Sequence, residues 1–134
     1  MNVIIEDIGD NRVRVQQKSA REPWKPKGKM CWYCCCDYGE HPIPMPIDFD
    51  DKRRTYIVCG TFCSFACISR YAQESRKFSA TGKRGMAIFQ LWREMTKSTS
   101  PRVPIAPPRQ FLDVFGGHMT IDEFRRSSDT ERYD

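Results

Sequence analysis

Apolar residues recur at spacings of three and four positions in two stretches of the chain, as in helices with one buried face. The first stretch follows Ser64, a good N-cap residue, and predicts a helix that ends near Lys77. The second predicts a helix from about Gly85 to Lys97. The two apolar stripes are Phe65, Ile68, Tyr71 and Ala72, and then Ile88, Leu91, Trp92 and Met95. We interpret both as ordinary core faces.

Residues 30–62 lack the helical period and have the composition of strands and turns. Residues 41–46 carry proline at every second position, which excludes a helix there and favours extended backbone. The run Thr55–Cys59 is rich in β-branched and aromatic residues and predicts a strand. Gly60 is expected to end that strand.

The N-terminal segment, residues 1–29, is predicted to be a basic, mostly flexible arm, in which residues 3–5 and 13–15 are candidate edge strands. Between Asn11 and Met30 it carries seven basic residues and one acidic residue, a net charge of +6. The basic residues are Arg12, Arg14, Lys18, Arg21, Lys25, Lys27 and Lys29. A polyanionic partner and a merely solvated segment explain this charge equally well.

The C-terminal part is predicted to be extended first and then to form short helices. Residues 98–108 hold four prolines, which favours an extended linker or a strap over the surface. Within residues 109–134 we expect two short helices and an acidic tail. The first begins at the Pro-Pro pair and is stopped by a Gly-Gly pair. The second begins at a capping box formed by Thr120 and Glu123.

The composition favours a small ordered core. The chain has 134 residues, 9 prolines and 8 glycines, and its mean hydropathy is −0.62. A core this small is expected to need an additional cross-link for stability. No apolar run approaches the ~20 residues of a membrane span, and the N-terminal residues lack the features of a signal peptide. We therefore expect a reducing compartment, where seven cysteines indicate metal ligands or reactive thiols rather than disulfides.

Four cysteines form two close pairs, Cys31 and Cys34 in a C-x₂-C motif and Cys63 and Cys67 in a C-x₃-C motif. Zn²⁺ takes four thiolates in a tetrahedron, at about 2.3 Å from each sulfur. A tight turn can present the first pair, and a helix start can present the second, where the helix dipole favours thiolate. Residues 30–97 are thus predicted to form a small α+β zinc-binding domain with a knuckle, a hairpin and a helix, of treble-clef character.

Other interpretations of the cysteines stay open. A thioredoxin-like redox pair needs a βαβ unit, which the pattern does not show, and buried free cysteines explain seven clustered thiols poorly. Cys36 competes with Cys34 for a place in the first pair, and His41 is an alternative ligand. Cys35 and Cys59 are expected to be bystanders.

No enzymatic activity and no small-molecule substrate are expected. The sequence contains no P-loop, zinc-protease or nucleophile-elbow motif. Four cysteines would also complete the coordination of the metal and leave no open position for a reacting water, so the zinc is predicted to be structural.

The cysteine pairs resemble a known group of proteins. Cys31-Trp-Tyr-Cys34, the proline-rich stretch and Gly60-Thr-Phe-Cys-Ser-Phe-Ala-Cys67, with Tyr71 following, resemble the MYM/TRASH-type zinc finger. More narrowly, they resemble the late gene transcription factor family of large nucleocytoplasmic DNA viruses, which includes the poxvirus late transcription factor. The segment from Ala106 to Phe124 resembles one that accompanies this finger in such proteins.

This resemblance, over roughly residues 31–125, implies that the two cysteine pairs bind zinc and that the protein acts in late viral transcription. It also implies a location in the host cell, in the cytoplasmic virus factory or the nucleus, or packaging in the virion. The chain departs from the family pattern at Cys35 and Cys36, which extend the first pair into three successive cysteines.

Three functions are compatible with these features. The first is a factor that contacts DNA or a viral RNA polymerase through cations of the arm and of the first helix. The second is a protein–protein adaptor with Trp24, Trp32 or Phe111 as anchors, and the third is a minor virion component. The cations around the first helix are Arg70, Arg76, Lys77, Lys83 and Arg84.

Overall fold

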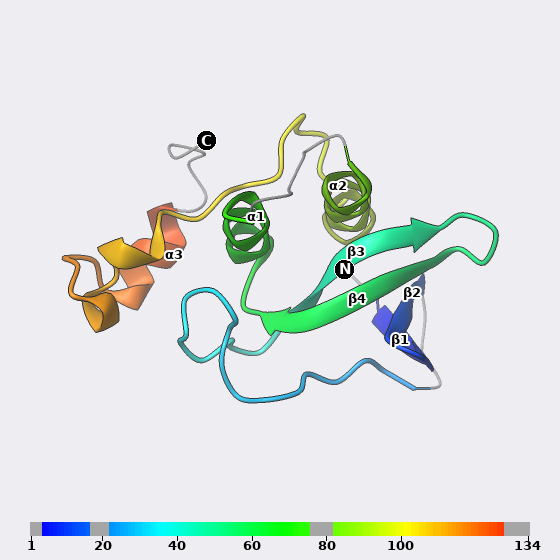
Figure 1. Ribbon diagram of the computed structural model, residues 1–134, viewed down its shortest axis with the longest axis horizontal. Coiled ribbons are helices and arrows are strands. Elements are labelled where there is room, and N and C mark those ends of the chain that lie inside the picture. The colour runs from blue at the N-terminus through cyan, green and yellow to red at the C-terminus, as the bar shows by residue number, and fades with distance from the viewer. Residues whose placement is uncertain (1–3, 17–21, 76–81, 128–134) are drawn as a thin grey trace.

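The computed structural model describes residues 4–16, 22–75 and 82–127, which form a four-stranded antiparallel sheet with helices packed on one face (Figure 1). The strands are β1 (Ile4–Gly9), β2 (Arg12–Gln16), β3 (Ile43–Asp50) and β4 (Thr55–Phe62), in the order β1-β2-β4-β3. The helices are α1 (Phe65–Gln73), α2 (Lys83–Thr96) and α3 (Ile121–Ser127), with 3₁₀ turns η1 (Arg109–Phe111) and η2 (Asp113–Phe115). The expectation of a small α+β fold is confirmed.

The N-terminal segment contains a hairpin, which corrects the expectation of a mostly flexible arm. Strands β1 and β2 pair around Asp10 and Asn11, whose φ angles of 56° and 59° suit a two-residue hairpin turn. Strand β2 then joins the central strand through the pair Val13–Tyr56. Val13 is fully buried, so the alternating apolar residues of this segment hold it on the sheet.

Strands β3 and β4 form the second hairpin. The prolines of residues 41–46 fall partly within β3, which lies at an edge of the sheet, where a residue without an N–H group is tolerated. Gly60 does not end β4, as the sequence analysis expected. The strand continues to Phe62, with Gly60 at a φ of +75° within it, and the ring of Trp32 lies where a Cβ atom of residue 60 would be.

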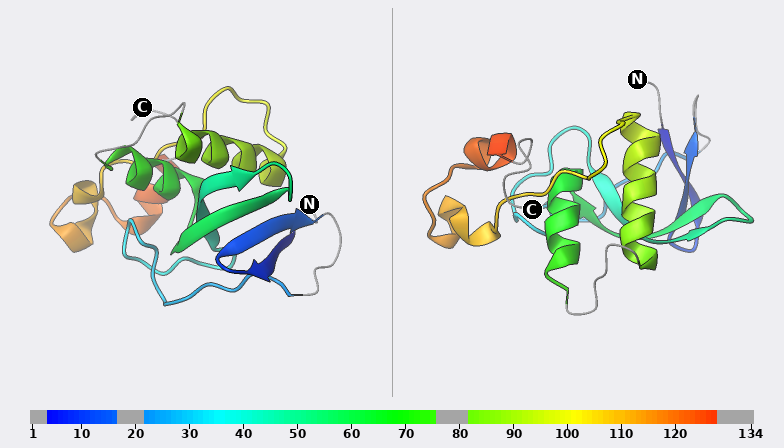
Figure 2. Two further views of the ribbon diagram at one scale, coloured as in Figure 1. Left: turned by 45° about the vertical axis from the view of Figure 1, so that its right-hand side comes forward. Right: turned by 90° about the horizontal axis from the view of Figure 1, so that it is seen from above.

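Helices α1 and α2 lie side by side on one face of β3 and β4, and the segment 22–42 crosses the opposite face (Figure 2). Ser64 caps α1 as predicted, because its side chain accepts a hydrogen bond from the Cys67 N–H. The helix ends at Gln73, before the predicted end at Lys77, which lies outside the described residues. The apolar stripes face the core as predicted, with Ile68 and Leu91 fully enclosed and Phe65, Tyr71 and Met95 partly buried.

Residues 98–108 run as a strap without regular structure beside α1 and α2. Ile105 and Ala106 are buried, and the Ala106 N–H donates to the carbonyl of Ala66 in α1 at 3.1 Å. From the other side, Arg70 Nε donates to the carbonyl of Ala106 at 2.8 Å. The strap is thus fastened to α1 by hydrogen bonds in both directions.

The short helix predicted after the Pro-Pro pair is replaced by the two 3₁₀ turns. Leu112 stands between them in an extended conformation, fully buried, and forms a bridge with Met119. The extended backbone of Leu112 thus separates the two turns and interrupts the helix. The capping box before α3 is confirmed, since Thr120 and Glu123 exchange hydrogen bonds of 3.0 and 3.2 Å.

Candidate metal centre

The first cysteine pair lies in a tight knuckle, residues 30–37. Met30 and Asp37 form an antiparallel bridge, and the Cys31 N–H donates to the Cys36 carbonyl at 2.9 Å. Cys35 takes a φ of +61° to complete the turn. The Tyr33 N–H points back at Cys31 Sγ, 3.4 Å away, and this bond orients the sulfur. The knuckle thereby presents both sulfurs of the pair on its inner side.

The second pair lies at the start of α1. Cys63 comes directly after β4, and Cys67 lies in the first turn of the helix. Ser64 receives hydrogen bonds from both ends of this pair, from Cys67 N at 3.2 Å and from Cys63 Sγ at 3.8 Å. The positive end of the helix dipole favours negative charge at these two sulfurs.

The structure brings the four predicted cysteines together, with their Sγ atoms all within 4.8 Å of one another. The Sγ atoms of Cys34 and Cys63 are 3.9 Å apart, and those of Cys63 and Cys67 are 3.6 Å apart. A tetrahedron with metal–sulfur bonds of about 2.3 Å has sulfur–sulfur edges of about 3.8 Å. These sulfurs therefore fit a tetrahedral thiophilic ion such as Zn²⁺. Cys31, Cys34 and Cys67 are buried, and Cys63 is partly exposed.

The four thiols are electrostatically linked. Hydrogen bonds from Cys34, and then from Cys63 and Cys67, hold the pKa of Cys31 well below its usual range. The hydrogen bond with Cys31 is the largest cause that raises the pKa of both Cys34 and Cys67. Four sulfurs at this spacing cannot all be thiolates without a cation between them. A divalent metal would replace their shared protons, so binding would release protons and weaken at low pH.

Helix α3 brings a positive charge to this cluster. The guanidinium of Arg125 donates to the carbonyl of Asp37 and forms a hydrogen bond with Cys63 Sγ. Burial alone would lower the pKa of Arg125, but the sulfurs of Cys63, Cys34 and Cys36 raise it. Because a divalent ion with four thiolates carries a formal charge of −2, Arg125 is placed to offset part of that charge.

Tyr33 connects the knuckle to α1 and to the strap. Its fully buried hydroxyl donates to Glu74 Oε2 at 3.0 Å and accepts from the Arg109 N–H at 2.7 Å. The Arg109 guanidinium lies over the Tyr33 ring, 4.5 Å from its centroid. Burial is the main cause that raises the pKa of Tyr33 to about 12. A residue between the two knuckle cysteines thus fixes the beginning of the C-terminal segment.

The other cysteines lie outside the cluster. Cys36 Sγ donates to the Cys34 carbonyl at 3.5 Å, and Cys35 is exposed. Burial raises the pKa of Cys59 on β4. In the part of the chain that the structure describes, neither Cys36 nor His41 belongs to the group that can hold a metal. The structure thus brings together the pair members favoured by spacing and not the alternative ligands.

The predicted nucleic-acid-binding residues are scattered and partly engaged elsewhere. Arg12 and Arg14 form salt bridges with acidic residues of the sheet at 3.4 and 3.5 Å, and Arg70 holds the strap. Three others are exposed on the segment after the first hairpin, namely Lys25, Lys27 and Lys29. Four lie outside the described residues, namely Lys18, Arg21, Arg76 and Lys77.

Sequence reasoning missed the contributions of Tyr33, Arg109 and Arg125. Only a weak indication in the sequence suggested that Tyr33 contributes to the site, namely its position between two predicted ligands. The two arginines lie 76 residues from Tyr33 and 88 residues from Asp37, the groups they bond, and no local pattern links such distant positions.

Comparison with known proteins gives one informative match. No family model matches the chain, and no solved structure matches it. The chain is 32% identical, over 101 residues, to an uncharacterized protein of Acanthamoeba polyphaga mimivirus. The match covers 72% of this chain and 28% of the relative, so the chain spans less than a third of that protein's length. Within the described residues, no helix is long and apolar enough to cross a membrane. The chain is thus a distant relative of a viral protein and carries a four-cysteine cluster suited to a metal.

Proposed function

We propose that this protein is a zinc-stabilised viral factor that acts in late transcription through contacts with DNA, with an RNA polymerase, or with both. Its place of action would be the site of virus replication in the host cell or the virion. The knuckle, the β3–β4 hairpin and α1 would form a treble-clef-like zinc finger, with Cys31, Cys34, Cys63 and Cys67 as the ligands.

One observation carries the proposal. The four sulfurs lie at tetrahedral spacing, three of the cysteines are buried, and four thiolates complete the coordination. A metal with four thiolate ligands would stabilise the fold of the finger and would not catalyse a reaction. Arg125 bonds to the knuckle at the Asp37 carbonyl, the exposed ring of Trp32 lies on the same knuckle, and the viral relative agrees with a viral role. Transcription itself is suggested by the resemblance of the cysteine pairs to the viral finger.

The first experiment measures bound metal by elemental mass spectrometry in protein purified under reducing conditions, for wild type, Cys63→Ser and Cys59→Ser. We expect one zinc per chain in the wild type and in Cys59→Ser, because Cys59 lies outside the cluster. Cys63→Ser should lose the metal and the native circular dichroism. A folded, zinc-free wild type would contradict the proposed finger.

The second experiment distinguishes direct contact with DNA from contact with the RNA polymerase. Binding of duplex DNA that weakens steeply with salt, in proportion to the phosphates neutralised, would support direct DNA contact. Copurification with viral RNA polymerase without DNA binding would support action through the polymerase. Absence of both interactions would reject the transcription role.

A protein–protein adaptor is the second candidate, favoured by apolar exposure on the knuckle. Met30 and Trp32 are 57% and 46% exposed and lie on either side of the ligand Cys31. Large exposed apolar and aromatic side chains on a rigid turn are typical anchors of an interface. A Met30→Ser variant that keeps its zinc but loses a viral protein partner, with DNA binding unchanged, would favour this candidate.

A further inference from the structure

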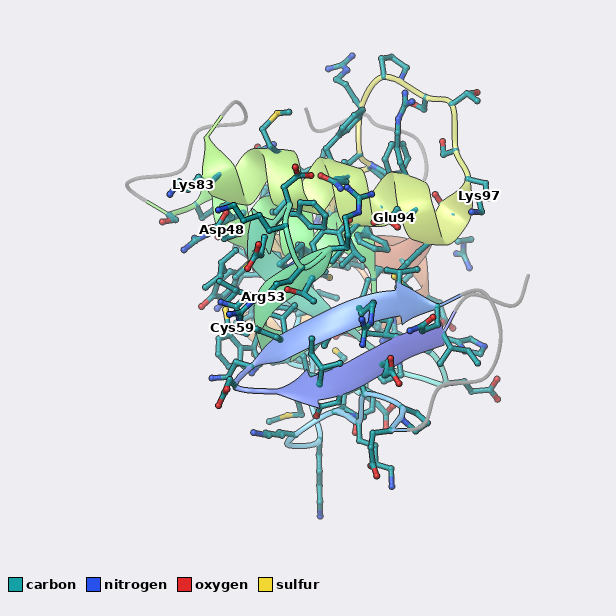
Figure 3. The ribbon with its side chains drawn as sticks, turned by 90° about the vertical axis from the view of Figure 1, so that its right-hand side faces the viewer. Asp48, Arg53, Cys59, Lys83, Glu94 and Lys97 are labelled. Atoms are coloured by element: carbon teal, nitrogen blue, oxygen red, sulfur yellow. The ribbon has the colours of Figure 1, made fainter. Side chains whose placement is uncertain are left out.

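Three hollows follow one another along β4, with volumes of about 220, 120 and 650 Å³. The first two share Asn11, Trp24, Lys27 and Val58 in their linings. The second and third hollows share Cys59 in their linings. In Figure 3, Cys59 lies on the same side of the view as Lys83, at the start of α2, and away from Lys97 at its end. We call these three hollows the β4 groove.

Aromatic rings line the β4 groove at successive points. Trp24 borders the first two hollows, Trp32 the second and Tyr71 the third. Trp32 is 46% exposed, yet its ring packs against Phe62 and Tyr71 at centroid distances of 6.1 and 6.0 Å. The backbone N–H of Trp32 also donates to the Thr61 carbonyl at 2.9 Å, which ties the residue to β4. The exposed part of the Trp32 ring is therefore held in a fixed orientation.

Gly60 makes this placement of Trp32 possible. A Cβ atom at position 60 would lie 2.8 Å from Cδ2 of the Trp32 ring, which is closer than real contacts allow. The glycine also adopts a φ of +75°, which residues with side chains avoid. The backbone of β4 is thus shaped to receive the indole ring beside the groove.

Four cations line the β4 groove without an ion-pair partner among the described residues, namely Lys25, Lys27, Arg84 and Arg109. The Arg109 guanidinium lies over the rings of Tyr33 and Phe115 and donates to the Trp32 carbonyl at 3.5 Å, so its positive charge is held beside Trp32. Arg12 also lines the groove but is bonded to Asp50. The acidic lining residues are Asp7, Asp10 and Glu74; the first two lie at the β1–β2 end, and Glu74 accepts a bond from Tyr33. From Trp24 to Arg109 the net charge is positive, because Lys25, Lys27, Arg84 and Arg109 outnumber the single carboxylate of Glu74.

We propose that the β4 groove binds single-stranded nucleic acid, with bases stacked on Trp32 and Trp24 and phosphates near Lys27, Arg84 and Arg109. This inference rests on the proposed nucleic-acid role and deepens it by naming the ligand. Aromatic rings and cations that follow one another along a groove are the recognition pattern for single strands, and here Trp32 is exposed while Trp24 and Tyr71 are partly buried. A duplex keeps its bases stacked on one another and offers no free base face to such rings.

The test titrates a fluorescently labelled oligothymidine into the zinc-loaded full chain and measures anisotropy and tryptophan fluorescence. Stacking should quench Trp24 and Trp32, while Trp92, which is only 5% exposed, should contribute a constant background. Trp32→Leu keeps an apolar side chain against Phe62 and should weaken binding by about 5- to 150-fold, the range for loss of one stacked base.

Charge variants test the phosphate contacts without disturbing the core. Arg84→Ala and Lys27→Ala should each weaken binding and lower the salt slope by about 0.7. Lys52→Ala is the matched control, because it removes the same charge from the exposed β3–β4 turn, outside the groove, and should bind like the wild type.

The outcomes separate this inference from the proposed function. Duplex binding without single-strand binding, or single-strand binding unchanged in Trp32→Leu and Arg84→Ala, would overturn the inference and leave the transcription role standing. Groove-dependent binding of a polyglutamate peptide, with no binding of oligothymidine, would also overturn it and assign the groove to an acidic protein segment. Single-strand binding lost in the groove variants and kept in Lys52→Ala would establish it.

Discussion

At the scale of single residues, the metal centre depends on side chains beyond its four cysteines. Arg125 brings a positive charge to the sulfurs, and Tyr33 joins the knuckle to the strap. The cysteines could be predicted because their spacing alone marks them as metal ligands. Arg125 and Tyr33 could not be assigned roles, because their partners are distant in sequence and the chemistry appears only after folding.

Removal of the Arg125 charge should speed the loss of zinc. Groups that bond to metal ligands typically change metal affinity by about 10- to 100-fold, and we expect a change of this size in Arg125→Ala. The release rate can be followed with a colorimetric zinc chelator. Arg126→Ala is the control, since residue 126 is exposed on the same helix, and an equal effect in both variants would refute a specific role of Arg125.

The Tyr33 hydroxyl should make stability fall in alkali. Its pKa is raised to about 12 from the ordinary value of 10.0, so the folded protein favours the neutral hydroxyl. The stabilisation is complete below about pH 10 and is lost as the pH rises towards 12. Tyr33→Phe should unfold about 1–3 kcal/mol more easily at neutral pH and lose less stability between pH 10 and 12, as measured by urea titration. An alkaline profile identical to the wild type would contradict this role.

At the scale of elements, the sequence predicted the helix caps and apolar faces correctly, because these features depend on residues that are close together in the chain. Ser64 caps α1, the apolar stripes face the core, and the Thr120–Glu123 box begins α3, each as the sequence indicated. The failures share a different cause. The 3₁₀ turns that replace a helix flank Leu112, which is extended and buried in the core, and the Trp32 ring packs at the point where β4 continues past Gly60.

Substitution of Gly60 should therefore cost more than substitution of another glycine with the same backbone strain. Gly60→Ala meets both the positive φ and the clash with Trp32, and we expect a loss of roughly 1–3 kcal/mol or more in unfolding free energy. Gly39→Ala is the matched control, with a φ of +79° and no atom within 4 Å of the added Cβ. Equal losses in the two variants would show that the Trp32 contact does not matter.

At the scale of the whole molecule, the metal centre lies where the knuckle, β4, α1 and the C-terminal segment meet. The order of strands in the sheet was not predictable from the sequence, because β2 pairs with β4 across a separation of more than 40 residues. Patterns of apolar residues identify strands but do not choose their distant partners. The spacing of the cysteines did indicate that the two pairs would converge, because four thiolates of two close pairs suit one tetrahedral ion.

Removal of the metal should unfold the molecule as a unit. Structural zinc contributes on the order of 10–16 kcal/mol of apparent binding free energy, which exceeds the typical net stability of a domain. Excess chelator at neutral pH should therefore abolish the native circular dichroism, and added zinc should restore it. Acid should act in the same direction, since the ligands must be deprotonated and stability falls as the pH falls. A native spectrum after complete removal of zinc would contradict this coupling.

The position of the four cysteines also bears on the order in which the protein is assembled during synthesis. All four precede residue 68, whereas the groups that bond the knuckle from the C-terminal side, Arg109 and Arg125, leave the ribosome much later. If the cluster binds an ion, a nascent chain could take it up while the residues after Cys67 are still being made. The strap and α3 would then pack onto a knuckle that already holds its ion, so we expect the metal to be bound before the C-terminal contacts form.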